Sequence, residues 1–240
     1  MEAISKNHLR EIARLKNKKF RNQADTVLVE GSRAVKHLSE NNVELLELYV
    51  SESSRDISFQ AGSTFLLKPD QFSRISSTKH PQQVSALVKK NSVPVSDHGF
   101  IIYLDHINEP GNLGTIIRTA EGAGASGIIL SKETCSIFNP KAIRASMGSI
   151  FTFPVEYHDI DWLRDVDARK IATSLHGAVD LFNYPKPKSN IVLIIGSEAE
   201  GISQPVLDLA DDKVKIPLKN NIESLNAAIA AGIAIYYFLH

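Results

Sequence analysis

NEPGNLGTIIRTAEGAGASG, residues 108–127, holds five of the thirteen glycines of the chain and follows the apolar segment FIIYLDHI. An apolar strand that leads through a glycine-containing turn into a helix is typical of parallel α/β folds. A dinucleotide-binding turn would need the spacing G-x-G-x-x-G and an acidic residue at the end of the next strand. These glycines are spaced differently, and the next strand, GIILSKE, has Ser131 and Lys132 where the acidic residue should stand, with Glu133 as a poor substitute. A nicotinamide enzyme is therefore an alternative that lacks its acidic partner, and no Walker loop occurs either.

Strand-like and helix-like segments alternate along the whole chain, which predicts an α/β protein with mainly parallel sheets. Near-continuous apolar strands such as IVLII indicate burial on both faces of a sheet. The stretch NSVPVSDHG, residues 91–99, mixes Ser, Pro and Gly between two apolar strands. We therefore expect one domain over residues 1–94 and a second over residues 95–240.

The composition is that of an ordinary soluble globular protein. The N-terminus lacks the apolar core of a signal peptide, and no run approaches the ~20 apolar residues of a membrane span. The single cysteine, Cys135, agrees with a reducing compartment, so we predict a cytoplasmic protein. The eight histidines show no metal-binding spacing, and we expect no metal site.

The formal net charge of zero hides an asymmetry between the two halves of the chain. Residues 1–95 carry 15 Lys and Arg against 10 Asp and Glu, a net of +5, and the remainder carries 12 against 17, a net of −5. Seven basic side chains fall in the first 21 residues: Lys6, Arg10, Arg14, Lys16, Lys18, Lys19 and Arg21. Such a cluster suits contacts with RNA phosphates, and its alternative interpretation is a solvated helix face.

Two later segments place polar residues where open α/β sheets bind ligands, just beyond the carboxyl ends of strands. IVLIIGSEAEGIS, residues 191–203, puts Gly196, Glu198 and Gly201 after a buried strand. KIPLKNNIESLNAA, residues 215–228, leads from the last strand through Ser224 and Asn226 into a long apolar helix.

These segments together carry a resemblance to a known family. NEPGNLGTIIRTA, IIGSEAEG and IPLKNNIESLN resemble the three ordered motifs of the SpoU/TrmH family, the RNA ribose 2′-O-methyltransferases of the SPOUT superfamily. KAIRASMG and SLHGA extend the resemblance over residues 100–240. More loosely, ISKNHLREIARLKNKKFR and TVLVEGSRAVKH are similar to the substrate-binding domain of that family, which has a ribosomal-protein-like α/β fold.

The resemblance implies methyl transfer from S-adenosylmethionine to a ribose 2′-hydroxyl, with rRNA favoured over tRNA. It also implies a deep trefoil knot in the C-terminal α/β domain. By position, the residues that would hold the cofactor are Gly196, Ser197, Gly201, Ile216, Pro217 and Leu225. Those that match the catalytic positions are Arg118, Asn112, Glu198, Ser224 and Asn226. Those expected to contact RNA are Lys6, Arg10, Arg14, Lys18, Lys19 and Arg21.

Several roles stay open at this stage. Arg118 could anchor the phosphate beside the target ribose, and a role as base would require an unusual deprotonated guanidinium. Glu198 could take part in catalysis or pair with Arg118. Asn112 and Arg118 could border one cleft only if Asn112 lies in the loop above the helix. Asn220 stands where the family usually has Gly, and Asn is the residue that best tolerates a positive φ in its place.

The resemblance further implies a homodimer in which the last helix packs against its mate and Arg118 acts near the neighbouring pocket. A core helix within one subunit is the alternative for the apolar helix, residues 227–238. At the level of function, the alternative is a non-catalytic RNA-binding or ribosome-assembly factor that retains the fold. The complete set of motif polar residues favours the enzyme.

Overall fold

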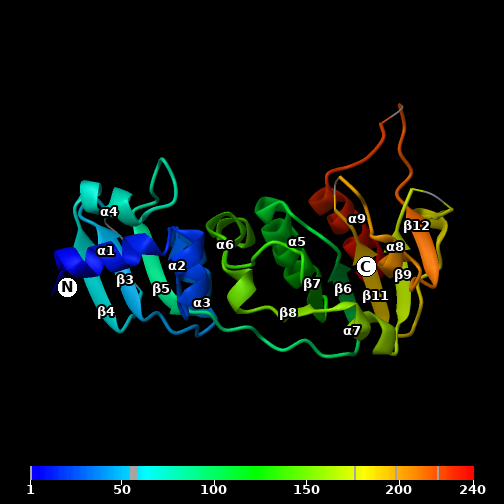
Figure 1. Ribbon diagram of the computed structural model, residues 1–240, viewed down its shortest axis with the longest axis horizontal. Coiled ribbons are helices and arrows are strands. Elements are labelled where there is room, and N and C mark those ends of the chain that lie inside the picture. The colour runs from blue at the N-terminus through cyan, green and yellow to red at the C-terminus, as the bar shows by residue number, and fades with distance from the viewer. Residues whose placement is uncertain (1, 55–58, 176, 198, 221) are drawn as a thin grey trace. The chain divides into compact units, whose positions relative to one another are not determined.

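The computed structural model describes residues 2–54, 59–175, 177–197, 199–220 and 222–240. The chain forms two compact units, whose elements are labelled in Figure 1. The first unit comprises residues 1–91 together with 138–152, and the second comprises residues 92–137 together with 153–240. The first passage between the units falls near the domain boundary expected after residue 94. No sequence signal marked the segment 138–152 as part of the first unit.

A five-stranded mixed sheet forms the centre of the first unit, with the strand order β1-β4-β3-β5-β2. Its strands are β1 (Glu2–Ala3), β2 (Thr26–Glu30), β3 (Glu47–Ser51), β4 (Ser63–Leu67) and β5 (Val84–Lys89). Its helices are α1 (Lys6–Arg14), α2 (Lys18–Gln23), α3 (Ser32–Glu40), α4 (Pro69–Ile75), α6 (Pro140–Ser146) and the 3₁₀ helix η1 (Ser149–Phe151). Strand β5 runs antiparallel to both of its neighbours, so the expectation of mainly parallel sheets does not extend to this unit.

Helices cover both faces of this sheet. On one face α1 and α4 bury Leu9, Ile12 and Phe72 against the strand residues Leu28 and Tyr49. Helix α3 buries an apolar stripe of its own, and α6 from the returning segment also belongs to this unit. The period-2 alternation of strand β2 supplies apolar residues to both layers.

The returning segment, residues 138–152, is tied to the first unit by specific contacts. The ring nitrogen Nε2 of His37 lies 3.1 Å from Oγ1 of Thr152. A Cβ placed on Gly148 would come within 3.3 Å of the backbone oxygen of Ala34, and its φ of +100° also favours glycine. The guanidinium of Arg144 lies 3.8 Å from the buried carboxylate of Glu30. These contacts explain why the segment groups with the first unit although the second unit flanks it in sequence.

The second unit is built on a seven-stranded sheet with the order β10-β12-β9-β11-β6-β7-β8, in which every pair is parallel. Its strands are β6 (Phe100–Leu104), β7 (Gly127–Ser131), β8 (Val155–His158), β9 (Arg169–Thr173), β10 (Val179–Asp180), β11 (Ile191–Ile195) and β12 (Asp212–Lys215). Its helices are α5 (Pro110–Ala123), α7 (Ile160–Asp165), α8 (Gln204–Leu207), α9 (Ala227–Leu239) and the 3₁₀ helix η2 (Leu181–Asn183). The predicted α/β fold with a parallel sheet is confirmed for this unit.

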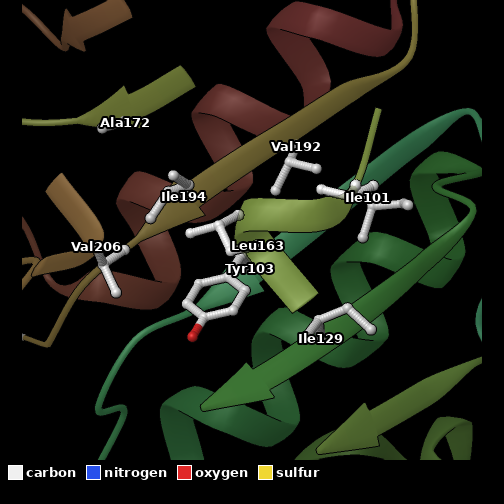
Figure 2. Packing of buried hydrophobic residues seen from close by; sticks show 9 residues of the cluster. Ile101, Tyr103, Ile129, Leu163, Ala172, Val192, Ile194 and Val206 are labelled. Carbon is white, nitrogen blue, oxygen red and sulfur yellow. The ribbon is translucent and has the colours of Figure 1, made fainter. Parts of the chain in front are cut away.

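Two apolar layers enclose the parallel sheet, as the continuous apolar strands predict. On one face Tyr103 and Ile194 pack with Leu163 of α7 and Val206 of α8 (Figure 2). Helices α5 and α9 pack against each other, and the ring of Phe238 in α9 lies 5.9 Å from that of Phe100 in β6. The trefoil knot that the resemblance implies stays a prediction. None of the helices described is long and apolar enough to cross a membrane.

Candidate active site and cofactor pocket

A cavity of about 470 Å³ lies at the carboxyl ends of β9, β11 and β12, which are neighbours in the sheet. Its walls come from the loops that follow these three strands and from the first turn of α9. The predicted cofactor and motif residues in the wall are Gly196, Ser197, Gly201, Ile216, Ser224 and Leu225. Pro217 is not part of the wall, although its neighbours on both sides are. Open parallel sheets bind ligands at this edge, so the cavity lies where the sequence places the cofactor.

The loop after β11 has a shape that only glycine permits at two positions. The backbone groups of Ser197 and Gly201 exchange two hydrogen bonds of 3.0 Å, which fold the loop back on itself. Gly201 has a φ of +70°, in the left-handed region. A Cβ on Gly196 would lie 2.1 Å from the carbonyl carbon of Gly201. These glycines therefore shape the pocket wall, while the predicted catalytic residue Glu198 lies outside the described residues.

The loop after β9 forms part of the wall that the sequence reasoning missed. Thr173, Ser174 and Leu175 line the cavity, and the Leu175 side chain is 51% exposed at its mouth. The Thr173 hydroxyl donates a 3.1 Å hydrogen bond to the carbonyl oxygen of Ile194, which ties this loop to β11. The signal that could have identified it was its place after a buried strand next to β11.

The third motif enters the site as the loop between β12 and α9. Ile216, Leu218 and Leu225 give the cavity apolar surface. Asn220 has a φ of 59°, which confirms that this position needs a residue tolerant of the left-handed region, where the family usually has Gly. The loop ends at Asn226, whose side-chain oxygen accepts hydrogen bonds from the first backbone N–H groups of α9.

The first and third motifs are joined directly by a pair of asparagines. Nδ2 of Asn226 donates a 3.0 Å hydrogen bond to Oδ1 of Asn112. Asn112 does not lie in a loop above the helix, which was the condition for it and Arg118 to border one cleft, because α5 begins at Pro110 and Asn112 belongs to its first turn. Glu109 caps the helix by accepting from the backbone of Gly111, and proline is favoured at the first helical position. Asn112 thus holds the start of α9 beside the start of α5.

Arg118 does not line the cavity. It follows Asn112 by six residues on the same helix, a separation of about 9 Å along the axis and roughly 120° around it. Neither residue belongs to the described cavity wall. Arg118 is exposed and makes no hydrogen bond or ion pair with any residue that the structure describes. The predicted catalytic residues are therefore not all gathered around one pocket within a single chain.

Three ionisable residues with shifted pKa values, Asp212, Arg169 and Tyr184, are hydrogen-bonded together at the end of the sheet away from the cavity. Asp212, at the start of β12, accepts hydrogen bonds from Nε of Arg169 at 2.6 Å and from the hydroxyl of Tyr184 at 2.7 Å. The bond from Arg169 lowers the pKa of the Asp212 carboxyl, against the opposing effect of burial. Burial is the main cause that raises the pKa of Tyr184. The two hydrogen bonds to Asp212 hold the amino end of β12, and the other end of this strand forms part of the pocket wall.

Five of the six residues predicted to contact RNA are exposed on the first unit: Lys6, Arg10, Arg14, Lys18 and Lys19. Three of them follow one another at intervals of four residues along α1, on the side away from its buried residues. Arg21 departs from the prediction, because it is only 5% exposed and donates to the backbone oxygens of Leu15 and Lys16. Its guanidinium therefore holds the turn between α1 and α2 and is not available to a phosphate.

Comparison with known proteins decides the family. Residues 99–236 match the SpoU rRNA Methylase family. The chain belongs to this family. Residues 6–86 match the MRM3-like substrate binding domain, so the SpoU methylase domain follows a substrate-binding domain in the chain.

Individual relatives share both parts of the chain. A protein of Bacillus subtilis named 23S rRNA (guanosine(2553)-2′-O)-methyltransferase RlmP is 30% identical over 243 residues, which cover 99% of this chain and 98% of the relative. The AdoMet-bound rRNA methyltransferase of Sinorhizobium meliloti matches with a TM-score of 0.85 and 29% identity, over 99% of this chain and 95% of that one. The SpoU methyltransferase AviRb of Streptomyces viridochromogenes in complex with AdoMet matches with a TM-score of 0.83 and 25% identity, covering 98% and 97%.

The cavity fits the S-adenosylmethionine that the family implies. Its volume lies within the range of about 300–1,000 Å³ that is common for small-molecule sites. At Gly196 the loop backbone packs so closely that an added Cβ would collide with the backbone of Gly201. Glycines at the wall leave peptide groups accessible there, and such groups can bind a polar cofactor. Glu200 and Lys215 are the charged residues among the described wall residues. Within the described part of the chain, no group of three or more His, Cys, Asp and Glu residues could hold a metal ion.

Proposed function

We propose that this protein methylates the 2′-hydroxyl of a ribose in ribosomal RNA, with S-adenosylmethionine as the methyl donor. The observation that carries the proposal is the cavity at the carboxyl ends of β9, β11 and β12, whose walls come from the second and third motifs of the SpoU family. The first motif adjoins it through the hydrogen bond between Asn112 and Asn226. When bound, S-adenosylmethionine supplies a methyl group activated by its sulfonium.

The side chains of this chain supply position and charge to the reaction. The Asn112–Asn226 bond holds the start of α5, and with it Arg118, in a fixed relation to the third-motif loop. Arg118 anchors the phosphate next to the target ribose, because a guanidinium stays protonated at neutral pH and binds phosphate oxygens in a bidentate way. Ser224, in the cavity wall, is placed to orient the hydroxyl group. Much of the rate then comes from orienting the reacting oxygen.

The active enzyme is a homodimer in this proposal. Ile229 and Tyr236, seven residues apart on α9, are 57% and 49% exposed, so this helix presents large apolar side chains to solvent in the single chain. Helix α9 packs on α5, which carries the exposed Arg118. Pairing α9 with its counterpart in a second copy would cover the apolar side chains and bring Arg118 to the pocket of the neighbouring subunit.

The preference for rRNA over tRNA rests on the first unit and on the relatives. The match to the MRM3-like substrate binding domain covers residues 6–86, where the exposed basic residues of α1 and α2 lie. The relative that spans the whole chain is named as a 23S rRNA enzyme. A substrate held by Lys6, Arg10 and their neighbours is bound through its phosphates, so its affinity falls as the salt concentration rises.

The first test is methyl transfer from labelled S-adenosylmethionine to rRNA that was transcribed in vitro and therefore carries no 2′-O-methyl groups. Nuclease digestion then locates the label. We expect label on a ribose. Label on bases, or none on any RNA, would overturn the proposal. If calorimetry showed that the wild-type protein does not bind S-adenosylmethionine, the alternative of a non-catalytic RNA-binding factor would be favoured.

The second test concerns Arg118 and the dimer. Arg118→Ala should abolish transfer while the dissociation constant for S-adenosylmethionine stays unchanged. Mixing this variant with Ser224→Ala, each inactive alone, should restore part of the activity if the site is shared between subunits. No restoration, or a monomer in sedimentation at assay concentration, would contradict the shared site.

A further inference from the structure

We propose that Asp105 is a positioning residue that holds the cofactor loop, the segment from Ile195 to Ser203, in the shape that binds S-adenosylmethionine. Asp105 precedes the first motif segment, which begins at Asn108, and it does not line the cavity. This inference rests on the proposed function, because it concerns the affinity of the same pocket.

The backbone and side chain of Asp105 hold both ends of the cofactor loop. Its backbone N–H donates to the carbonyl oxygen of Ile195, the last residue of β11, at 2.9 Å. Its carboxylate oxygen Oδ2 accepts from the backbone N–H of Ser203, where α8 begins, at 2.7 Å. Between these points the chain contributes Gly196, Gly201 and other residues to the cavity wall. Asp105, the residue that follows β6, thus fixes where the loop leaves the sheet and where it enters the next helix.

The carboxylate is buried, so its hydrogen bonds matter for the loop. The Asp105 side chain is only 1% exposed, and its other oxygen, Oδ1, lies 2.7 Å from Nδ1 of His106. The backbone N–H of His106 in turn donates to Oγ of Ser131 at the end of β7, at 3.0 Å. A charged acceptor strengthens a hydrogen bond, and a buried one that loses its donor pays the full cost of desolvation. The hydrogen bond from Ser203 to the buried carboxylate of Asp105 therefore favours the folded-back conformation of the loop over conformations in which Ser203 moves away from Asp105.

Asp105 also connects the first two motifs. It follows the last residue of β6, and the chain runs from it through the turn at His106 to α5, which carries Asn112 and Arg118. Its carboxylate reaches the end of the second motif at Ser203. The asparagine pair joins the first motif to the third, so the segment from Asp105 to Asn112 is bonded to the loops of both the second and the third motif. Releasing Asp105 should loosen the second-motif loop alone.

A matched pair of variants at Ser203 tests the clamp without altering Asp105. Ser203 has a φ of −61°, which suits proline, and its side chain makes no capping hydrogen bond. Ser203→Pro removes the N–H that Asp105 accepts, whereas Ser203→Ala keeps it. A second pair acts on the acceptor: Asp105→Asn retains an oxygen for Ser203, and Asp105→Ala removes it.

The readout is the dissociation constant for S-adenosylmethionine by calorimetry. We expect Ser203→Pro and Asp105→Ala to weaken binding roughly tenfold to hundredfold, and their partners to stay within about threefold of wild type. The rate at saturating cofactor and the affinity for rRNA should change little. Val155→Ala, a core change in the distant edge strand β8, should lower the melting temperature without moving the dissociation constant.

The outcomes separate this inference from the proposed function. If wild type binds S-adenosylmethionine and both Ser203→Pro and Asp105→Ala bind it equally well, the clamp is refuted while the function stands. If Val155→Ala weakens binding as much as they do, general destabilisation explains the effect and the clamp is also refuted. If wild type does not bind the cofactor, the proposed function fails and this inference fails with it. Should Ser203→Pro not fold, the Asp105 pair decides.

Discussion

Gly196→Ala tests whether the shape of the second-motif loop creates the pocket. The added Cβ would lie 2.1 Å from the carbonyl carbon of Gly201 and 2.3 Å from the backbone nitrogen of Ile202. All the nearest atoms belong to backbone, so no side chain can turn away. Ordinary van der Waals contact begins at 3.4 Å, and the facing strand of the loop must therefore retreat by more than 1 Å.

Such a movement has a cost that can be estimated from the contacts. The two hydrogen bonds between Ser197 and Gly201 cannot both survive it, and each contributes about 0.5–1.5 kcal/mol. If the loop instead keeps its shape, overpacking costs about 1–3 kcal/mol. In either case, forming the cofactor-binding loop costs about 2 kcal/mol more in Gly196→Ala than in wild type, which corresponds to a dissociation constant roughly thirtyfold higher. Calorimetry with S-adenosylmethionine measures this directly.

Gly122→Ala provides the control within the same unit. Gly122 lies inside α5, and nothing lies within 4 Å of an added Cβ there. Because alanine is the better helix former, this variant should be more stable than wild type by about 0.5–1 kcal/mol and bind the cofactor normally. The reasoning would be refuted if Gly196→Ala bound S-adenosylmethionine within threefold of wild type while retaining its melting temperature.

Substitutions at four further positions separate structural from functional roles. Asn226→Ala removes both the cap of α9 and the donor to Asn112, and should lower the free energy of unfolding in urea by about 1–2 kcal/mol. Asn226→Asp keeps a capping oxygen but loses that donor, so its stability should lie between those of Asn226→Ala and wild type, and equal stability of all three would contradict the cap. Arg21→Ala should lower the free energy of unfolding by about 1–3 kcal/mol, because it removes two buried hydrogen bonds. Arg10→Ala should leave the free energy of unfolding unchanged but reduce the salt dependence of rRNA binding, measured by filter binding, by about one charge. The opposite pattern would show that Arg10 is the structural residue and Arg21 the RNA contact. Since Arg169 lowers the pKa of Asp212 below its ordinary value near 4, the contribution of this carboxylate is complete above about pH 4 and is lost as the pH falls through the lowered pKa. Asp212→Asn should therefore be less stable than wild type at neutral pH, and the difference in stability should shrink as the pH falls below about 4. A difference that is equal at neutral and acid pH would argue against the ion pair.

The sequence was most informative where local chemistry is decisive. Gly196 and Gly201 follow an apolar strand, and a buried parallel strand must end at the ligand-binding edge, so their place in a pocket wall followed from pattern alone. The positive φ of Asn220 was expected from the resemblance, because the family usually has Gly at this position and Asn is the residue that best tolerates such a φ. The early start of α5 could have been recognised from Pro110, which is favoured at the first helical position.

Other features depend on contacts between segments that are distant in sequence. Arg21 resembles its basic neighbours in sequence, yet the turn between two helices brings carbonyl oxygens to it and buries it. The Asn112–Asn226 bond and the clamp by Asp105 each join residues about a hundred positions apart. Periodicity and spacing report on local structure and therefore cannot reveal such pairs.

The return of residues 138–152 to the first unit has a consequence for the order of events during synthesis. The first unit cannot be completed when Asn91 leaves the ribosome, because α6 and η1 lie about sixty residues further along the chain. At bacterial and eukaryotic elongation speeds of about 5–20 residues per second, this delay amounts to about 3–12 s. During that interval Glu30 lacks Arg144, and His37 lacks Thr152. The nascent N-terminal half is thus an incomplete domain that depends on later parts of its own chain, and a fragment ending at Asn91 would remain in that state permanently.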